Sequence, residues 1–339
     1  MSPQGNITAE GVIAIDREMS RQHDDALASY GAAAELAARI AEAMHLRKRV
    51  LLLGIGGSHA VNRMAEVEYR ARGIQAVAIS LSEQLYSPLD LGDAVIIVTS
   101  QSGESAEVHR ILNVLSGHSA AYGMTLEASS TLGRMLPSLV GAGGTEHAFA
   151  ATRSLMITLA LHLGVLAALG LDAIPALDAL RARARLDVKE AVKLLKPCRA
   201  IVFSGRGLRG LAEAAALSTM ELARMPAYAL EGGQFRHGPL EILGPDLGAV
   251  HFCADEPATS LVGGLARDTV AGGSPTLVFD TSGSDEVRGD LTLRFPRASG
   301  VAAILSMLPT AQRLAIGIAG QRVSDVGIPV RTTKITRTE

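Results

Sequence analysis

The stretch Val95–Ser105 reads VIIVTSQSGES, and it decides the fold. Its first half, Val95–Thr99, is a run of β-branched and apolar residues, which is typical of a strand buried on both faces of a parallel sheet. Its second half, Ser100–Ser105, is small and rich in hydroxyl groups, and a helical apolar pattern begins at Ala106. The stretch therefore predicts a buried strand, a tight loop and a helix N-terminus in immediate succession.

This loop has the composition of an anion site. The first backbone N–H groups of a helix have no partner within it, and the helix dipole places about half an elementary charge at that end. Serine hydroxyls and the Gln101 amide add donors, and Gly103 lets the backbone approach a ligand closely. An ordinary serine N-cap would need only one of these residues. The predicted phosphate-binding residues of this loop are Ser100, Gln101, Ser102 and Ser105.

A second strand–loop–helix unit precedes the first. Arg49–Leu53 (RVLLL) predicts a strand, and Gly54–Ser58 (GIGGS) a glycine turn before a helix. A dinucleotide fingerprint begins similarly, but this turn lacks the third glycine, and the following strand, 74–79, offers no acidic residue for a ribose. Two such loops at neighbouring strand ends instead favour one phosphate between them, with Gly57 and Ser58 contributing.

Composition limits the class of protein. The chain has 339 residues, of which 48% are hydrophobic and only 3% aromatic, with no tryptophan, so its core is built from aliphatic residues as in α/β proteins. Lys+Arg 32 against Asp+Glu 34 gives a net charge of −2, without the basic excess of a nucleic-acid-binding protein. Cys198 and Cys253 lack metal-ligand spacing, which favours buried thiols in a reducing compartment.

No segment predicts export or membrane insertion. Residues 1–11 lack the basic and apolar regions of a signal peptide. Leu155–Leu171 is strongly apolar, but it is short for a membrane span, contains His162 and is followed closely by Pro175, so a buried helix is expected. The sequence therefore predicts a soluble, cytoplasmic protein.

The remaining pattern indicates a duplicated α/β chain. A strand at 199–203, the glycine turn Ser204–Gly207 and a helix at 208–222 repeat the unit that begins at Arg49, about 150 residues earlier. We expect further strands at 74–79, 120–124, around 138–139, 248–253 and 276–279, and further helices at 14–45, 152–169 and 301–318. The expected organisation is N-terminal helices (1–45), a first domain (46–175), a second domain (186–325) and a tail (326–339).

The quoted loop also resembles a known family. Ser100–Ser105 is similar to the SQSGE[ST] loop of the sugar isomerase (SIS) family, which holds a sugar phosphate. Nearly the whole chain, from about residue 15 to 339, resembles the isomerase half of glucosamine-6-phosphate synthase and stand-alone deaminases of the same family. The resemblance implies two tandem SIS subdomains, each a flavodoxin-like, three-layer αβα unit on a parallel sheet, a tail that covers the active site, and a homodimer.

The resemblance further implies catalytic residues. Glu221 and His237 match the family's catalytic glutamate and the histidine of its H-G-P-L motif, and Lys334 matches a tail lysine that lies over the sugar. Glu221 is then the base that moves a proton between C1 and C2. His237 serves ring opening in its own or the neighbouring subunit, and Lys334 assists ring opening or forms a Schiff base.

The sugar-binding residues implied by the resemblance are Phe149, Ala151, Thr152 and Thr333. The chain departs from the family pattern in three places. Its Ser-Thr-Lys triplet is Ala151–Arg153 here, its lysine three residues before the glutamate is Ser218, and its arginine after the tail proline is Val330. Positions at the triplet and at Ser218 line the sugar rather than the phosphate, so the choice of sugar stays open.

The sequence thus predicts an enzyme that converts an amino-sugar 6-phosphate, such as glucosamine 6-phosphate, to fructose 6-phosphate and ammonia, with no cofactor or metal. Because no glutaminase domain precedes the two subdomains, deamination is favoured over synthesis. The alternatives are a deglycase of a 6-phosphorylated fructosamine-type adduct, a ketose–aldose phosphate isomerase and a non-catalytic sugar-phosphate sensor. A sensor would not need Glu221, His237 and Lys334 together, and the chain has no basic patch for nucleic acid.

Overall fold

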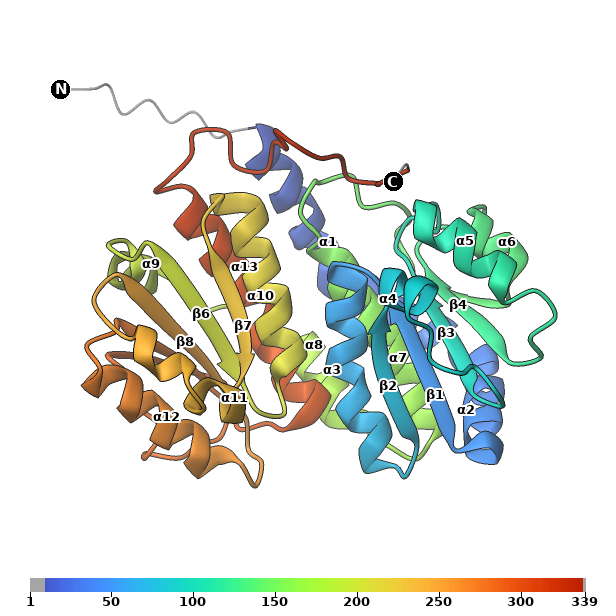
Figure 1. The fold of residues 1–339 in the computed structure, drawn as a ribbon, viewed down its shortest axis with the longest axis horizontal. Helices are drawn as coiled ribbons and strands as arrows, with labels where there is room; N and C mark the ends of the chain where they lie inside the picture. Colours follow the sequence, from blue (N-terminus) through green and yellow to red (C-terminus); the bar gives the residue numbers. More distant parts are fainter. Residues whose placement is uncertain (1–9, 338–339) are drawn as a thin grey trace.

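The computed structural model describes residues 10–337 of the chain. The stretch 1–9, where the sequence predicts no signal peptide, and residues 338–339 at the end of the predicted tail lie outside the described residues. Two five-stranded sheets stand side by side, each covered by helices on both faces (Figure 1). Every strand pairing among the described residues is parallel, which confirms the predicted α/β class.

The strands and helices have the following bounds. The first sheet contains β1 (Arg49–Gly54), β2 (Gln75–Ser80), β3 (Val95–Thr99), β4 (Ala121–Thr125) and β5 (Ser138–Val140). The second contains β6 (Ala200–Gly205), β7 (Ala227–Glu231), β8 (Leu247–Cys253), β9 (Thr276–Asp280) and β10 (Leu291–Arg294). The helices up to β6 are α1 (Glu10–Ala32), α2 (Ala34–Arg47), α3 (Gly57–Ala71), α4 (Leu81–Tyr86), α5 (Ala106–Val114), α6 (Thr131–Met135), α7 (Arg153–Ala168), α8 (Ile174–Ala182) and α9 (Lys189–Leu195). Those after β6 are α10 (Arg209–Ala223), α11 (Gly232–Arg236), the 3-10 turn η1 (Pro239–Ile242), α12 (Thr259–Ala271) and α13 (Gly300–Ala319).

The two sheets share one strand order. The first is ordered β2-β1-β3-β4-β5 and the second, taken from its other edge, β7-β6-β8-β9-β10. Strand β6 therefore corresponds to β1, and β8 to β3, as the predicted duplication requires. Val50 of β1 lies opposite Val95 of β3, so the glycine turn 54–58 and the loop 100–105 leave the same edge of the first sheet side by side.

The structure adds elements that the sequence pattern did not predict. Strands β7 and β10 form the two edges of the second sheet, and most of their residues are only half-buried, so neither shows the apolar run of a central strand. Two further helices, α8 and α9, lie between α7 and β6. The predicted central strands are all present, with ends that differ by one or two residues.

The helices α3 and α10 join the two halves by a close backbone contact. An added Cβ at Gly210 of α10 would lie 2.4 Å from the Met64 nitrogen and 2.7 Å from the Ala60 carbonyl oxygen of α3. At the other end of the contact, a Cβ at Gly56 would lie 4.0 Å from Leu217 Cδ2. The two helices are therefore antiparallel, and the C-terminal half of α10 lies at the glycine turn that begins α3.

The helices α7 and α13 are the most apolar of the described chain. Every residue of α7 from Arg153 to Leu166 is buried, as predicted for a core helix. Helix α13 is long and apolar enough to cross a membrane by length and composition alone. Its most apolar window is, however, 83% buried inside the structure, and the core helix of a globular fold meets the same criteria.

Candidate active site

The loop Ser100–Ser105 has a fixed backbone at the carboxyl end of β3. Gly103 has a φ of +66°, and an added Cβ would lie 2.2 Å from Ser130 Oγ, so only glycine fits there. Ser100 Oγ accepts a hydrogen bond from the Gly103 N–H (3.1 Å), and Ser102 Oγ accepts one from the Glu104 N–H (3.2 Å). The shape of the loop thus requires its small residues.

The start of α5 offers donors for an anion. Ser105 is the N-cap residue, and its buried Oγ has no hydrogen-bond partner among the described residues. The next N–H group, of Ala106, donates to the carbonyl oxygen of Thr336 in the C-terminal tail (3.1 Å). An unsatisfied hydroxyl and a helix N–H that bonds to the tail therefore meet where the sequence predicts a phosphate.

The second glycine turn and the start of α7 converge on this loop. An added Cβ at Gly57 would lie 3.4 Å from Ala151 Cβ and 3.8 Å from Gln101 Nε2. Ser58 is buried in the first turn of α3. Residues from three separate elements, each predicted to touch the substrate, are thus brought together. Phe149, which is half-buried, lies in the same chain segment just before Ala151.

A buried carboxylate that the sequence analysis did not single out lies at the centre of this region. Glu146 accepts hydrogen bonds from the Thr152 N–H (2.9 Å) and hydroxyl (3.1 Å), from Ser154, and from Lys334 Nζ (3.1 Å). Burial acts to raise its pKa, but Lys334 and the hydrogen bonds from Ser154 and Thr152 outweigh it and hold the pKa of Glu146 below its usual value. Glu146 is the only acidic residue between Glu127 and Asp172, and it lies in a glycine-rich loop before a helix. This isolated carboxylate was the one feature of the sequence that could have indicated a functional role for Glu146.

Arg153 holds the loop that carries Glu146. Its buried guanidinium bonds Glu18 Oε2 (2.6 Å) and Asp25 Oδ2 (3.0 Å) of α1, and it donates to the Gly144 carbonyl (2.8 Å). Arg153, the third residue of the triplet that opens α7, therefore bonds to α1 and to the 142–147 loop. Thr152 contacts Glu146 instead, as described above.

Glu221 lies in the last turn of α10, one turn after Leu217 and on the same helix face. Burial raises the pKa of Glu221 to about 7, and the negative charge of Glu146 adds to this effect, while Lys334 opposes it. A carboxyl group with a pKa near neutrality is suited to accept and return a proton. Lys334 thus interacts with both carboxylates. Glu146 is held ionised, whereas Glu221 has a pKa near neutral pH and is therefore about half protonated there.

The C-terminal tail is fixed at its base and crosses the edge of the first sheet. Arg224, which follows α10, bonds Asp325 (2.8 Å) and the Ile328 carbonyl (3.0 Å), and so ties the tail to the helix that carries Glu221. From there the tail runs over the first half toward α5 (Figure 1). Thr333 is exposed, and its hydroxyl donates to the Ile335 carbonyl (2.9 Å).

His237 does not lie with the other predicted catalytic residues of the same chain. It follows α11 at the carboxyl edge of the second sheet, where Glu231 of β7 pairs with Gly205 of β6. Helix α10 begins at that edge, and the twelve residue-to-residue steps from Arg209 to Glu221 span about 18 Å. Figure 1 shows α11 at the end of the second half opposite to the tail. His237 is exposed there.

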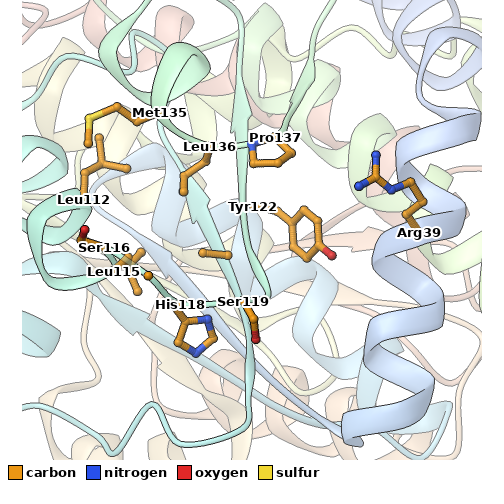
Figure 2. A pocket seen from close by; sticks show the side chains of 12 residues that line it. Arg39, Leu112, Leu115, Ser116, His118, Ser119, Tyr122, Met135, Leu136 and Pro137 are labelled. Atoms are coloured by element: carbon orange, nitrogen blue, oxygen red, sulfur yellow. The ribbon is translucent and has the colours of Figure 1, made fainter.

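The described residues 10–337 contain no cluster of three or more His, Cys, Asp or Glu side chains that could hold a metal ion. Both cysteines are buried and free, as predicted. A pocket at the other edge of the first sheet, drawn in Figure 2, lies where α5 ends and β4 begins. It contains none of the predicted site residues; Arg39, His118, Tyr122 and Met135 are among the residues that line it.

Comparisons with known proteins agree with this fold. No protein-family model matches the chain. It is 28% identical over 320 residues to the glutamine–fructose-6-phosphate aminotransferase (isomerizing) of Aeropyrum pernix, covering 86% of this chain and 51% of that protein. The chain thus spans about half the length of the curated relatives it matches.

Solved structures give the same result. The C-terminal domain of glucosamine-fructose-6-phosphate aminotransferase from Francisella tularensis superposes with a TM-score of 0.82 at 17% identity, over 97% of this chain and 100% of that one. Tagatose-6-phosphate ketose/aldose isomerase from Escherichia coli gives 0.77 at 19% identity, over 98% and 100%. Glucosamine-6-phosphate deaminase from Thermotoga maritima gives 0.70 at 19%, over 92% and 99%.

The predicted resemblance to the sugar isomerase family is confirmed. It covers the fold of both halves, and it extends to a distant sequence relationship with the isomerase half of aminotransferases. In this sugar isomerase fold, the residues gathered at the edge of the first sheet form the candidate active site.

Proposed function

We propose that the chain is a phosphosugar isomerase that deaminates an amino-sugar 6-phosphate, such as glucosamine 6-phosphate, to fructose 6-phosphate and ammonia. The observation that carries the proposal is Glu221, whose pKa is raised to about 7 beside Lys334 and Glu146, at the edge where the phosphate loop ends. The names of the neighbours support the substrate class, since they include a sugar-phosphate isomerase and a glucosamine-6-phosphate deaminase.

In this proposal the phosphate binds between the two loops of the first sheet. The Ser105 hydroxyl and the N–H groups at the start of α5 donate to it, and Ser58, Ser100, Gln101 and Ser102 surround it. Because the Thr336 carbonyl accepts from the Ala106 N–H, the phosphate displaces the tail at that point and leaves Lys334 over the sugar. Binding energy from the phosphate thereby positions C1 and C2 at Glu221.

Glu221 then transfers the proton. From the open-chain aldehyde it removes the proton on C2 while the C1 oxygen takes up a proton, which gives an enolamine. It then returns the first proton to C1 while the amine gives up a proton, so that C1 becomes a hydroxymethyl group and C2 an imine. Water adds to the C2 imine carbon and ammonia leaves, which gives the ketose. The ammonium group of Lys334 faces the developing negative charge on the C1 oxygen. Because Lys334 is ion-paired with the buried Glu146, we assign it this charged role and not that of a Schiff-base nucleophile.

Ring opening requires a further acid or base, and within one chain His237 is too far from Glu221 to provide it. We propose a homodimer in which His237 of a second copy reaches this site. The loop 232–238 is glycine-rich and exposed at its end, which is consistent with such a role. A ketose–aldose isomerase would use the same groups, since its proton transfer between C1 and C2 is identical and only the substituent on C2 differs.

The test is to incubate the protein with glucosamine 6-phosphate and to measure ammonia and fructose 6-phosphate together, with Glu221→Gln as the matched isosteric control. Equal amounts of both products, lost in Glu221→Gln by about 10²–10⁴-fold, would support the proposal. Turnover of tagatose 6-phosphate or fructose 6-phosphate to an aldose without amine release would replace the deaminase with a ketose–aldose isomerase. Thermal stabilisation by the sugar phosphates without turnover of any would favour a deglycase or a sensor.

A further inference from the structure

A buried polar network lies directly beneath the two phosphate loops. Asn62 of α3 accepts hydrogen bonds through Oδ1 from the Thr99 hydroxyl (2.8 Å) and from His162 Nε2 of α7 (3.1 Å). His162 Nδ1 in turn lies 3.0 Å from the Tyr69 hydroxyl. All four side chains are at most 1% exposed, so the network has no access to bulk water.

With the Asn62 amide oriented as in the structure, the donors and acceptors of this network follow from one another. An amide oxygen only accepts, so His162 Nε2 must carry the proton and donate to Asn62. Burial lowers the pKa of His162 to about 3, so the imidazole is neutral, and its Nδ1 accepts from the Tyr69 hydroxyl. Tyr69 and Thr99 therefore donate at the two ends, and one tautomer of His162 satisfies the chain between them. A single arrangement of this kind fixes the elements that it joins.

The network touches each element that carries part of the candidate site. Thr99 is the last residue of β3 and immediately precedes Ser100 of the phosphate loop. Asn62 lies on α3, whose first turn is the other glycine loop, and its unpartnered Nδ2 lies 2.8 Å from a Cβ added at Gly54. His162 lies on α7, which begins after Ala151 and Thr152.

We propose that Asn62, His162 and Tyr69 are positioning residues that hold Thr99, and through it the Ser100–Ser105 loop, in the conformation that binds the substrate phosphate. This inference rests on the proposed function. The residues touch no substrate atom. They act by fixing the strand end from which the loop departs, relative to the helices that carry the other side of the site.

The second half supplies a matched control. There Ser204 Oγ of β6 lies 2.9 Å from the Nδ1 of buried His251, whose Nε2 lies 3.1 Å from Thr269 Oγ1. This pair is equally buried, but it lies beneath loops that hold no predicted phosphate. Thr99→Val and Ser204→Ala each remove one buried hydroxyl from a histidine network, and only the first should affect phosphate binding.

The experiment measures the dissociation constant for inorganic phosphate by calorimetry, hydrogen exchange of the 100–106 amides, and the melting temperature of the full chain. We expect Thr99→Val to weaken phosphate binding about five- to tenfold and to speed exchange in the loop, with kcat for a turned-over sugar phosphate changed less than about threefold. Thr99→Ser, which keeps the hydroxyl, should restore the affinity to within about twofold. Ser204→Ala should lower the melting temperature by a similar amount and leave phosphate affinity unchanged.

Unchanged phosphate affinity in Thr99→Val would overturn the positioning role, and so would an equal loss in Ser204→Ala, which would mean that both substitutions act through global stability. A wild-type chain that binds no phosphate would overturn the proposed function and this inference together, and it would be recognised before any variant is measured. A wild type that binds phosphate without turning over an amino-sugar phosphate would refute only the proposed reaction, because the affinity measurements still decide the role of the network.

Discussion

The loop after β3 in the first half and the loop after β8 in the second half leave equivalent strands of two sheets with one strand order, yet they carry opposite chemistry. The first reads Ser100–Ser105 and presents hydroxyls and helix N–H groups. The second contains Asp255 and Glu256, two carboxylates. Counted from the last strand residue, Ser102 and Glu256 are both third.

In the second half, the carboxylate of Glu256 occupies the place that corresponds to the proposed phosphate site of the first half. Glu256 Oε1 accepts from the Gly207 N–H (3.4 Å), and a Cβ added at Gly207 would lie 2.3 Å from Glu256 Oε2. The glycine turn that corresponds to 54–58 is thus capped by a protein carboxylate. Because one fold supports both arrangements, the proposed phosphate binding would depend on the loops and not on the α/β architecture.

The largest loss of activity is expected when the phosphate loop of the first half is given a carboxylate like that of the second half. In Ser102→Glu a carboxylate enters the phosphate loop at the position of Glu256, and it repels a phosphate dianion. Like charges in such contact cost several kcal/mol, so kcat/KM for the sugar phosphate should fall about 10³-fold. Steady-state kinetics and phosphate calorimetry measure this loss.

Ser102→Gln separates charge from size in the same experiment. The glutamine side chain has the shape of the glutamate but no charge, so it should retain most of the phosphate affinity that Ser102→Glu loses. Equal losses in the two variants would mean that volume alone closes the loop, and the electrostatic comparison between the halves would be wrong.

The second prediction concerns the tail, whose residues Lys334 and Thr336 contact the first half. Replacing Lys334 with Met removes the cation that lowers the pKa of both Glu146 and Glu221. Glu221 then stays protonated at neutral pH, so kcat/KM should fall about 10²-fold and the pH profile should move to higher pH. Arg337→Met removes an exposed tail cation instead, and it should have little effect. Similar losses in both variants would point to the net charge of the tail.

The features that could be predicted from the sequence are those set by local residues, and those that could not depend on contacts between distant parts of the chain. Central strands and glycine loops were predictable, because apolar runs and small residues report burial and tight turns locally. The position of His237 was not, because it depends on which end of α10 meets which edge of the second sheet. Nor was the role of Glu146, since its partner Lys334 is 188 residues away along the chain. Likewise, Arg153 finds its partners on α1, beyond the reach of any local pattern.

The third prediction uses the pKa of Glu221. With a pKa of about 7, the ionised base should rise from about a tenth to about nine-tenths between pH 6 and 8, so kcat/KM should increase about tenfold over that range. The same shift sets a stability effect. The folded state holds the proton that the unfolded state releases above about pH 4.5, so this group contributes less stability as the pH rises from there to about 7.

Glu221→Gln isolates that contribution. The variant should match the wild type in free energy of unfolding near pH 4 and exceed it by about 3 kcal/mol at pH 8, while losing activity. Denaturant titrations at the two pH values measure the difference. A variant that is less stable than the wild type at pH 8 would show that the ionised carboxylate is favourably held, and Glu221 would then be a poor candidate for the base.

The smallest effect on activity is expected in the second half, where Glu256 has a pKa raised mainly by burial, with Glu68 adding to the shift. Glu256→Gln can still accept from the Gly207 N–H, and it removes a carboxylate that is unfavourably ionised at neutral pH. Turnover and phosphate affinity at the first half should therefore equal those of the wild type, while the melting temperature should rise at pH 8 and stay unchanged at pH 4. If this variant instead binds a second phosphate per chain, the loop of the second half is a latent anion site that one carboxylate closes. A loss of activity would mean that the two halves are coupled through α10, whose first turn lies beside Gly207 and whose last turn carries Glu221.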